Sequence, residues 1–147
     1  MIFGIAGKNC AGKDTVADYL KSKGFEYLSL SDAIRDELAQ KKIEPTRENL
    51  IRAGTQIREK YGSGELARRI AKKVSPGKNY AIVSIRNPQE VRELEKLDGF
   101  FMVEVRASEK LRFGRMKSRA RAGDPQALGQ FIAAEKAEAA SKNSAAQ

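Results

Sequence analysis

The chain has no histidine and a single cysteine, Cys10, among its 147 residues. The absence of histidine excludes Ser–His–Asp triads, imidazole zinc sites and histidine acid–base chemistry. One cysteine can form neither an internal disulfide nor a cysteine-based metal cluster. No apolar run approaches the roughly 18 residues that span a bilayer, and the segment after Met1 lacks the charged region and cleavage site of a signal peptide. We therefore expect a cytoplasmic protein with no membrane partner.

Positive charge is in surplus, because 28 lysines and arginines face 19 acidic residues and give a net charge of +9. Such a surplus favours anionic partners, namely nucleotides, phosphorylated metabolites or nucleic acid. Aromatic residues make up only 7% of the chain, and no basic strand carries the aromatic side chains typical of RNA-binding sheets. Nucleic acid is therefore the less favoured partner.

Short apolar runs alternate with segments of helical spacing along the chain. The runs predicted as strands cover residues 2–6, 25–30, 80–85 and 100–105. The residues predicted to cap helices are Ser31, Thr46, Asn87, Ser108 and Asp124. After Asp124-Pro125 we expect a last helix with Leu128, Phe131 and Ile132 turned inward, and an Ala-rich tail over residues 133–147 that frays. Alternating strands and helices imply a parallel sheet, so we predict a single three-layer α/β domain over residues 1–147.

The segment that follows the first predicted strand has the spacing G-x-x-x-x-G-K. Backbone amides in such a loop curl around phosphate oxygens, and the following helix directs its positive end at them. The lysine, Lys13, is then placed to reach the β- and γ-phosphates of ATP. The strand before the loop and the helix after it are the context that the motif requires. The residues predicted to bind ATP are Gly7, Lys8, Asn9, Cys10, Ala11, Gly12, Lys13, Asp14 and Thr15.

One position departs from the usual motif. The residue after the lysine is commonly Ser or Thr, whose hydroxyl holds Mg²⁺, but here it is Asp14, followed by Thr15. A carboxylate is a good hard-oxygen ligand for Mg²⁺. Either Asp14 or Thr15 is therefore a candidate metal ligand, and Thr15 is alternatively a contact for the α-phosphate.

Several runs resemble known kinases. Gly12–Leu20 resembles the phosphate loop and first helix of phage-type deoxynucleoside monophosphate kinases. Ser31–Glu37, Glu44–Leu50, Ile85–Val91 and Arg119–Pro125 resemble, in the same order, a family of P-loop kinases related to dephospho-CoA kinase and the adenylate-kinase group. The resemblance covers nearly the whole chain. It implies a P-loop NTPase fold like that of nucleoside monophosphate kinases, with ATP as phosphate donor.

Four residues outside the loop are predicted to serve the transfer. Asp32 follows the second strand, at the edge where open α/β sheets bind ligands, and is expected to orient or deprotonate the acceptor. Arg35, one turn later, is expected to hold an acceptor phosphate. The alternatives are that Asp32 stabilises the first turn of its helix and that Arg35 forms a surface ion pair. The resemblance implies that Arg58 lies over the acceptor and that Arg86, after the third strand, reaches over the phosphate loop.

Residues 109–125 form a basic segment that resembles a lid. In kinases of this architecture such a segment closes over the γ-phosphate and excludes water. We expect one or two of its arginines to touch phosphate and the others to be solvated. The members of this cluster are Arg112, Arg115, Lys117, Arg119 and Arg121, of which Arg115 and Arg119 are predicted to be catalytic and Arg121 to bind ATP.

Related kinases continue past the lid helix into a further strand, which this sequence lacks. We therefore expect residues 100–105 to form an exposed sheet edge, with a shortened chain, a fragment or self-association as explanations. The predicted function is transfer of the γ-phosphate from ATP, with Mg²⁺, to a nucleoside monophosphate or similar small phosphorylated acceptor. The alternatives are dephospho-CoA kinase-like activity and, in another class, a non-catalytic ATP-binding regulator or a basic nucleic-acid-binding protein.

Overall fold

The computed structural model describes residues 1–120 and 124–144, with side chains described as far as residue 137. The chain forms two compact units. The first unit combines Met1–Ala6 with Asp14–Glu104, and the second combines Gly7–Lys13 with Val105–Gln147. The phosphate-loop segment therefore belongs to the same unit as the segment after the last strand.

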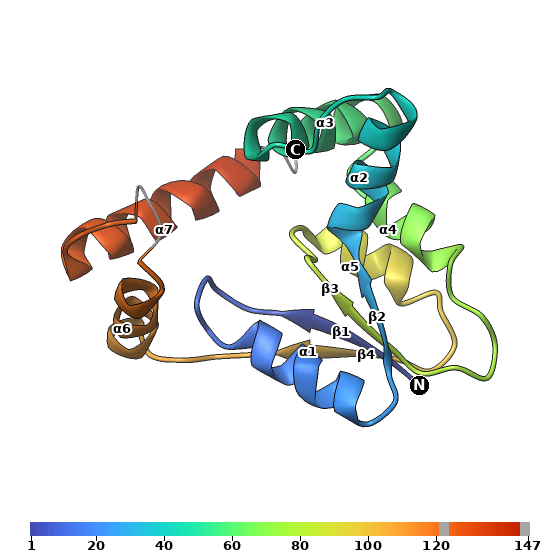
Figure 1. Ribbon diagram of the computed structural model, residues 1–147, viewed down its shortest axis with the longest axis horizontal. Coiled ribbons are helices and arrows are strands. Elements are labelled where there is room, and N and C mark those ends of the chain that lie inside the picture. Colours follow the sequence, from blue (N-terminus) through green and yellow to red (C-terminus); the bar gives the residue numbers. More distant parts are fainter. Residues whose placement is uncertain (121–123, 145–147) are drawn as a thin grey trace. The chain divides into compact units, whose positions relative to one another are not determined.

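The first unit is built on a parallel sheet of four strands in the order β2-β3-β1-β4 (Figure 1). The strands are β1 (Ile2–Ala6), β2 (Glu26–Ser29), β3 (Tyr80–Val83) and β4 (Phe100–Glu104). In register, Ile2 pairs with both Tyr80 and Phe100. All four residues of β3 are buried, as expected for an inner strand of a parallel sheet with helices on both faces. The predicted α/β fold with a parallel sheet is confirmed.

Helices cover both faces of this sheet. α1 (Lys13–Ser22) lies on one face, and the helices after β2 and β3 lie on the other (Figure 1). These helices are α2 (Leu30–Gln40), α3 (Arg47–Tyr61), α4 (Glu65–Ala71) and α5 (Pro88–Leu94). Their apolar residues, such as Leu30, Ile57 and Ile70, form one core with Tyr80 and Ile82 of the sheet. This core fixes the strand ends from which the candidate site residues project.

Three of the predicted helix caps are confirmed. Thr46 Oγ1 accepts from the Asn49 amide at 3.2 Å, and Ser108 Oγ accepts from the Leu111 amide at 3.3 Å. Asn87 Oδ1 accepts from the Glu90 amide at 3.0 Å, with Pro88 as the first helical residue. These caps depend on residues three positions apart, so the local sequence is sufficient to predict them.

The prediction of Ser31 as a cap is wrong. The cap of α2 is Ser29, which has extended backbone, and its hydroxyl accepts from the Ser31 amide at 3.3 Å. The Asp32 carboxylate in turn accepts from the Ser29 amide at 3.2 Å and completes a capping box. The helix therefore begins at Leu30, two residues before the predicted start.

In the second unit, α6 (Glu109–Arg119) packs with α7 (Leu128–Ser144), and the rings of Phe113 and Phe131 lie 5.9 Å apart. Asp124 does not start the last helix, because Gln130 Oε1 accepts from the amides of Gln126 and Ala127 at 3.1 and 3.3 Å just before α7. Leu128 is 36% exposed rather than turned inward, whereas Phe131 is 2% exposed as predicted. The part of the Ala-rich segment that is described is helical to Ser144. Among the described residues, no helix has both the length and the apolar character needed to cross a bilayer.

Candidate functional site

The phosphate-loop segment has a backbone that only certain residues tolerate. Gly7, Cys10 and Gly12 have φ angles of 149°, 58° and 107°. A Cβ at Gly7 would stand 2.3 Å from the carbonyl oxygen of Val105, which no real side chain permits. The Ala11 amide donates to the Lys8 carbonyl at 3.2 Å and closes a tight turn. Such successive turns make a concave array of amides suited to an anion.

Lys13 lies at the start of α1, at the end of the loop. Its ammonium Nζ donates to the carbonyl oxygens of Gly7 at 2.9 Å and Lys8 at 2.8 Å. The lysine thus folds back over the first half of the loop. A compact cation in this position is what the transfer of a charged phosphoryl group requires.

Two arginines of α6 contact the second half of the loop. Arg115 Nη1 donates to the carbonyl oxygens of Cys10 at 3.2 Å and Ala11 at 2.9 Å. Arg112 Nη1 donates to the carbonyl oxygen of Asn9 at 3.4 Å. Together with Lys13, these side chains provide a cationic donor for five successive carbonyls, those of residues 7 to 11. Arg115 was predicted as a lid residue over phosphate, and here its guanidinium binds the loop backbone.

Arg112 is buried, with 1% of its surface exposed. Its guanidinium forms two hydrogen bonds with the Glu135 carboxylate of α7, one of them from Nη2 at 2.9 Å, and Nε donates to the Ala107 carbonyl at 3.0 Å. The ring of Phe131 lies 5.2 Å from the guanidinium carbon. The hydrogen bonds to Glu135 raise the pKa of Arg112 further above its ordinary value. The sequence analysis did not select Glu135, although its spacing of four residues from the buried Phe131 is a signal that places both on one face of α7.

Of the other two lid arginines, Arg119 is placed by the structure and Arg121 lies outside the described residues. Arg119 Nη2 donates to the Asp124 carboxylate at 3.3 and 3.5 Å. Its Nε atom is buried and has no hydrogen-bond partner among the described residues. The predicted roles of Arg119 at the γ-phosphate and of Arg121 in ATP binding stay predictions.

The two candidate metal ligands stand in the first turn of α1. Asp14 and Thr15 are both exposed. The described residues contain no group of three or more His, Cys, Asp or Glu side chains able to hold a metal on their own. One carboxylate and one hydroxyl fit Mg²⁺ all the same, because this ion commonly takes one or two protein oxygens and completes its shell with phosphate oxygens and water.

The predicted acceptor residues Asp32 and Arg35 are brought together in the first unit. Arg35 Nη1 donates to Asp32 Oδ1 at 3.1 Å, and the two side chains are 50% and 41% exposed. Asp32 also serves the capping box of α2. Both alternatives stated for this pair, helix stabilisation and a surface ion pair, are therefore present. A half-exposed pair of this kind contributes little to stability and separates easily, so both groups remain accessible to a ligand.

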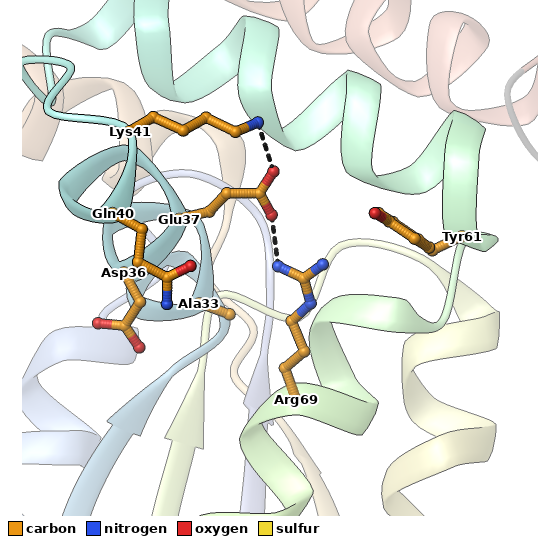
Figure 2. Close-up of a pocket in the computed structure, with 7 residues that line it drawn as sticks. All are labelled: Ala33, Asp36, Glu37, Gln40, Lys41, Tyr61 and Arg69. Atoms are coloured by element: carbon orange, nitrogen blue, oxygen red, sulfur yellow. Dashed lines mark hydrogen bonds and ion pairs between the residues drawn. The ribbon is translucent and has the colours of Figure 1, made fainter.

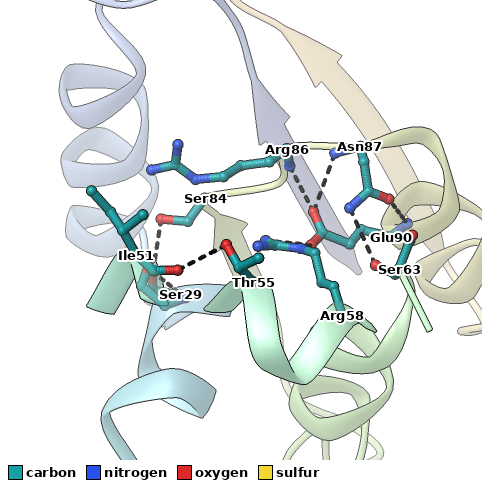
Figure 3. A network of polar contacts seen from close by, with 10 residues as sticks. Ser29, Ile51, Thr55, Arg58, Ser63, Ser84, Arg86, Asn87 and Glu90 are labelled. Atoms are coloured by element: carbon teal, nitrogen blue, oxygen red, sulfur yellow. Dashed lines mark hydrogen bonds and ion pairs between the residues drawn. The ribbon is translucent and has the colours of Figure 1, made fainter. Parts of the chain in front are cut away.

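Arg58 and Arg86 meet at the carboxylate of Glu90, which is fully buried (Figure 3). Arg58 donates to Glu90 Oε1 through Nε at 3.2 Å and Nη2 at 3.0 Å. The backbone amide of Arg86 donates to Glu90 Oε2 at 2.7 Å. The Arg86 side chain is exposed and extends on the side of Ser84. Glu90, which the sequence analysis did not single out, therefore holds Arg58 and shapes the turn that presents Arg86.

Ser84, just after β3, adopts a left-handed backbone with a φ of 65°. Its hydroxyl lies 2.9 Å from that of Ser29 at the end of β2. This contact joins the carboxyl ends of two neighbouring strands. Asp32 and Arg86, which follow these ends, therefore belong to the edge of the sheet at which β1 leads into the phosphate loop.

The cavities in the described part of the molecule include one of about 450 Å³ and one of about 710 Å³. The first is bounded by α2, α4 and Tyr61, and contains none of the predicted site residues (Figure 2). Its charges are paired, because Glu37 accepts from Lys41 at 2.8 Å and from Arg69 at 2.5 Å. The second runs along α6 beside Arg115 and is lined by Ser108, Lys110, Leu111, Gly114, Arg115 and Ser118.

Comparison with known proteins gives the chain its family. The AAA domain family matches residues 4–139. The UPF0200 protein of Hyperthermus butylicus is 34% identical over 133 residues, which are 89% of this chain and 72% of that protein. The UPF0200 protein of Pyrococcus abyssi is 31% identical over 145 residues, which are 94% of this chain and 78% of that protein.

Among solved structures, the crystal structure of TT1252 from Thermus thermophilus is similar with a TM-score of 0.58 and 22% identity, covering 93% of this chain and 79% of that one. At this identity the likeness shows the fold. Together with the glycine-lysine loop between β1 and α1, the family match identifies a P-loop, nucleotide-binding domain. The chain belongs to the AAA domain family and to the UPF0200 proteins.

Proposed function

We propose that the protein is an ATP-dependent phosphotransferase that moves the γ-phosphate to a nucleoside monophosphate or a similar small phosphorylated acceptor. The observation that carries the proposal is the phosphate loop. Lys13 donates to the carbonyls of Gly7 and Lys8 in this loop, and Arg115 donates to the carbonyl of Ala11. A loop of this kind binds phosphates through its amides and the positive end of the following helix.

The donor is held by the second unit. Lys13 exchanges the carbonyls of Gly7 and Lys8 for the β- and γ-phosphate oxygens when ATP binds. The cavity along α6 offers Leu111, which is 49% exposed, as an apolar surface for the nucleoside. Asp14 or Thr15 would hold Mg²⁺, which would supply positive charge to neutralise the phosphate oxygens. Arg119 and Arg121 are the proposed lid contacts to the γ-phosphate.

The acceptor is bound through Asp32, Arg35, Arg58 and Arg86. Arg35 and Arg86 carry exposed guanidinium groups suited to an acceptor phosphate. In the transfer, the bond between the γ-phosphorus and the β–γ bridging oxygen breaks, and a bond from the γ-phosphorus to an acceptor oxygen forms. A phosphate acceptor attacks as an anion and has no proton to lose. A hydroxyl acceptor, as in dephospho-CoA, gives its proton to Asp32.

A direct assay tests the proposal. The protein is incubated with Mg-ATP and, separately, with each nucleoside monophosphate and dephospho-CoA, and ADP and the phosphorylated product are quantified. We expect ADP to form only with an acceptor. Lys13→Ala should lower the rate by at least about 10²-fold, whereas Lys21→Ala, at the other end of α1, should leave it unchanged.

Other outcomes identify the alternatives. Product from dephospho-CoA alone would replace the nucleoside monophosphate as acceptor. ATP binding without turnover, or hydrolysis that no acceptor stimulates, would favour a regulator. Binding to nucleic acid that falls steeply with salt and ignores ATP would favour a nucleic-acid-binding protein.

A further inference from the structure

We propose that Arg112, held by Glu135, is a positioning residue that sets the phosphate loop for nucleotide binding. The inference rests on the proposed function only in that the loop is the donor-phosphate site. Neither side chain is expected to touch the nucleotide. Arg112 acts through the carbonyl of Asn9, and Glu135 acts through Arg112.

The geometry of the peptide group gives the carbonyl contacts their effect. Peptide bonds in the described chain are trans, so each carbonyl points opposite to the amide of the next residue. Arg112 holds the Asn9 carbonyl at 3.4 Å and Arg115 holds the Cys10 and Ala11 carbonyls at 3.2 and 2.9 Å. With these carbonyls bound to α6, the amides of Cys10 and Gly12 are turned away from α6, toward the concave side of the loop.

Cys10 is the residue that most needs such support. Its φ of 58° lies in the left-handed region, which residues with a Cβ seldom adopt. The peptide groups on both sides of Cys10 are bound, the preceding one by Arg112 and the following one by Arg115. Without these contacts the intrinsic preference of Cys10 favours a different backbone, and the amides no longer converge.

Glu135 fixes the orientation of the Arg112 guanidinium. A free arginine samples many side-chain conformations, but here both carboxylate oxygens of Glu135 bind the guanidinium, and Nε is bound to Ala107. A guanidinium that is 1% exposed also requires a partner for its charge. The pair therefore aims Nη1 at the loop and keeps it there in the absence of ligand.

Electrostatics and positioning predict opposite effects of Glu135. Its carboxylate lies 3.9 Å from Nζ of Lys8, so it places negative charge close to the loop. If charge alone mattered, Glu135→Gln would tighten the binding of a polyanion. If Glu135 positions Arg112, the same change weakens binding, because the new amide group presents a donor to the guanidinium.

The test uses Glu135→Gln, the double variant Arg112→Met with Glu135→Met, and, as a control, Lys136→Met at an exposed position of α7. The double variant keeps the net charge of the protein, and replacing a buried ion pair with apolar groups tends to preserve stability. Binding of Mg-ATP and of inorganic tripolyphosphate is measured by calorimetry, and folding by thermal unfolding. We expect about tenfold or greater loss of affinity for both ligands in both variants, and none in Lys136→Met.

Cys10 supplies a second readout, because it is the single cysteine of the sequence. Its alkylation rate without nucleotide should rise in both variants if the loop no longer keeps one conformation, and stay unchanged in Lys136→Met. Should the double variant fail to fold, Glu135→Gln, which replaces one oxygen, carries the test. Wild-type affinity in a folded variant, or tighter binding by Glu135→Gln, would overturn the inference.

The two proposals fail separately. Normal nucleotide affinity with no acceptor phosphorylated would refute the transferase and leave Arg112 as a positioning residue. Transfer by the wild-type protein with unchanged affinity in the variants would refute the role of Arg112 and Glu135 alone.

Discussion

Asp14 stands where a hydroxyl residue commonly follows the lysine of a phosphate loop. Its carboxylate and the hydroxyl of Thr15 are both exposed in the first turn of α1. A carboxylate is the stronger ligand for Mg²⁺, but it also repels a triphosphate that carries no metal. The two effects have opposite signs and can therefore be separated.

We expect Asp14→Asn to raise the Mg²⁺ concentration needed for half-maximal ATP binding by about tenfold, roughly the effect of one lost charge-assisted contact. In the presence of a chelator, the same variant should bind free ATP more tightly than the wild type. Thr15→Val should change the Mg²⁺ requirement less. A larger effect at Thr15 than at Asp14 would assign the metal to the hydroxyl. Titration of a fluorescent ATP analogue measures both quantities.

At the scale of single residues, the local sequence predicts the loop but not the arginines that bind its carbonyls. Lys13 at the start of α1 follows from the motif and its flanking strand and helix. The partners of the Asn9, Cys10 and Ala11 carbonyls are 103 to 105 positions away in sequence. Arg112 and Arg115 resemble the other basic residues of their segment, so nothing in the sequence distinguishes the buried side chain from the exposed one. Only the packing of α6 with α7 does so.

At the scale of elements, α2 and α4 are joined by a carboxylate that is held on two sides. Glu37 accepts from Lys41 on its own helix and from Arg69 on α4. The hydrogen bond from Lys41, followed by that from Arg69, holds the pKa of Glu37 below its ordinary value of 4.5. A lowered pKa in the folded state means that this contribution to stability is present above pH 4.5 and is lost as the pH falls through the lowered value.

Glu37→Gln should therefore lower the free energy of unfolding at pH 7 by about 1 kcal/mol, a size set by the partial exposure of the pair. The difference from the wild type should shrink as the pH falls below about 4.5. Urea unfolding at pH 7, 5 and 3 measures this, with Glu59→Gln on the exposed side of α3 as control. A difference that stays constant down to pH 3 would show that Glu37 acts by packing rather than by its charge.

The starts of the helices show where element-level prediction succeeds. Thr46, Asn87 and Ser108 cap their helices as predicted because each is the clearest capping residue in its segment. Ser31 fails because Ser29, two positions earlier, is also a serine and already has the extended backbone of a cap. The choice between them depends on where β2 ends, which pairing with β3 decides.

At the scale of the whole molecule, the sequence predicts the sign of the net charge but not which charged side chains are paired with one another. The surplus of +9 correctly suggests anionic ligands. Three arginines that contribute to this surplus, Arg58, Arg69 and Arg112, are paired with glutamates in the folded chain. Those pairings link distant segments, so they become visible only in three dimensions.

The exposed edge strand β4 leads us to a prediction about self-association. Among the described residues, β4 pairs with β1 and ends the strand order. Phe101 and Met102 on this strand are 55% and 39% exposed. An apolar edge strand is a template for pairing with another chain, so we expect the protein to self-associate with increasing concentration. Phe101→Lys should shift sedimentation toward the monomer, and Ile51→Lys, on the exposed side of α3, should not. A wild-type monomer at all concentrations would contradict this expectation.

The contacts of Lys13 affect which anions can bind to the phosphate loop. Its ammonium already satisfies two backbone oxygens, so an incoming anion must displace them and leave them to water. A small monovalent anion cannot replace both hydrogen bonds of the Lys13 ammonium, whereas a chain of linked phosphates can replace them together. We therefore expect the loop to bind anions of several linked phosphates more tightly than small monovalent anions. Discrimination between one nucleoside and another must then come from other residues of the protein.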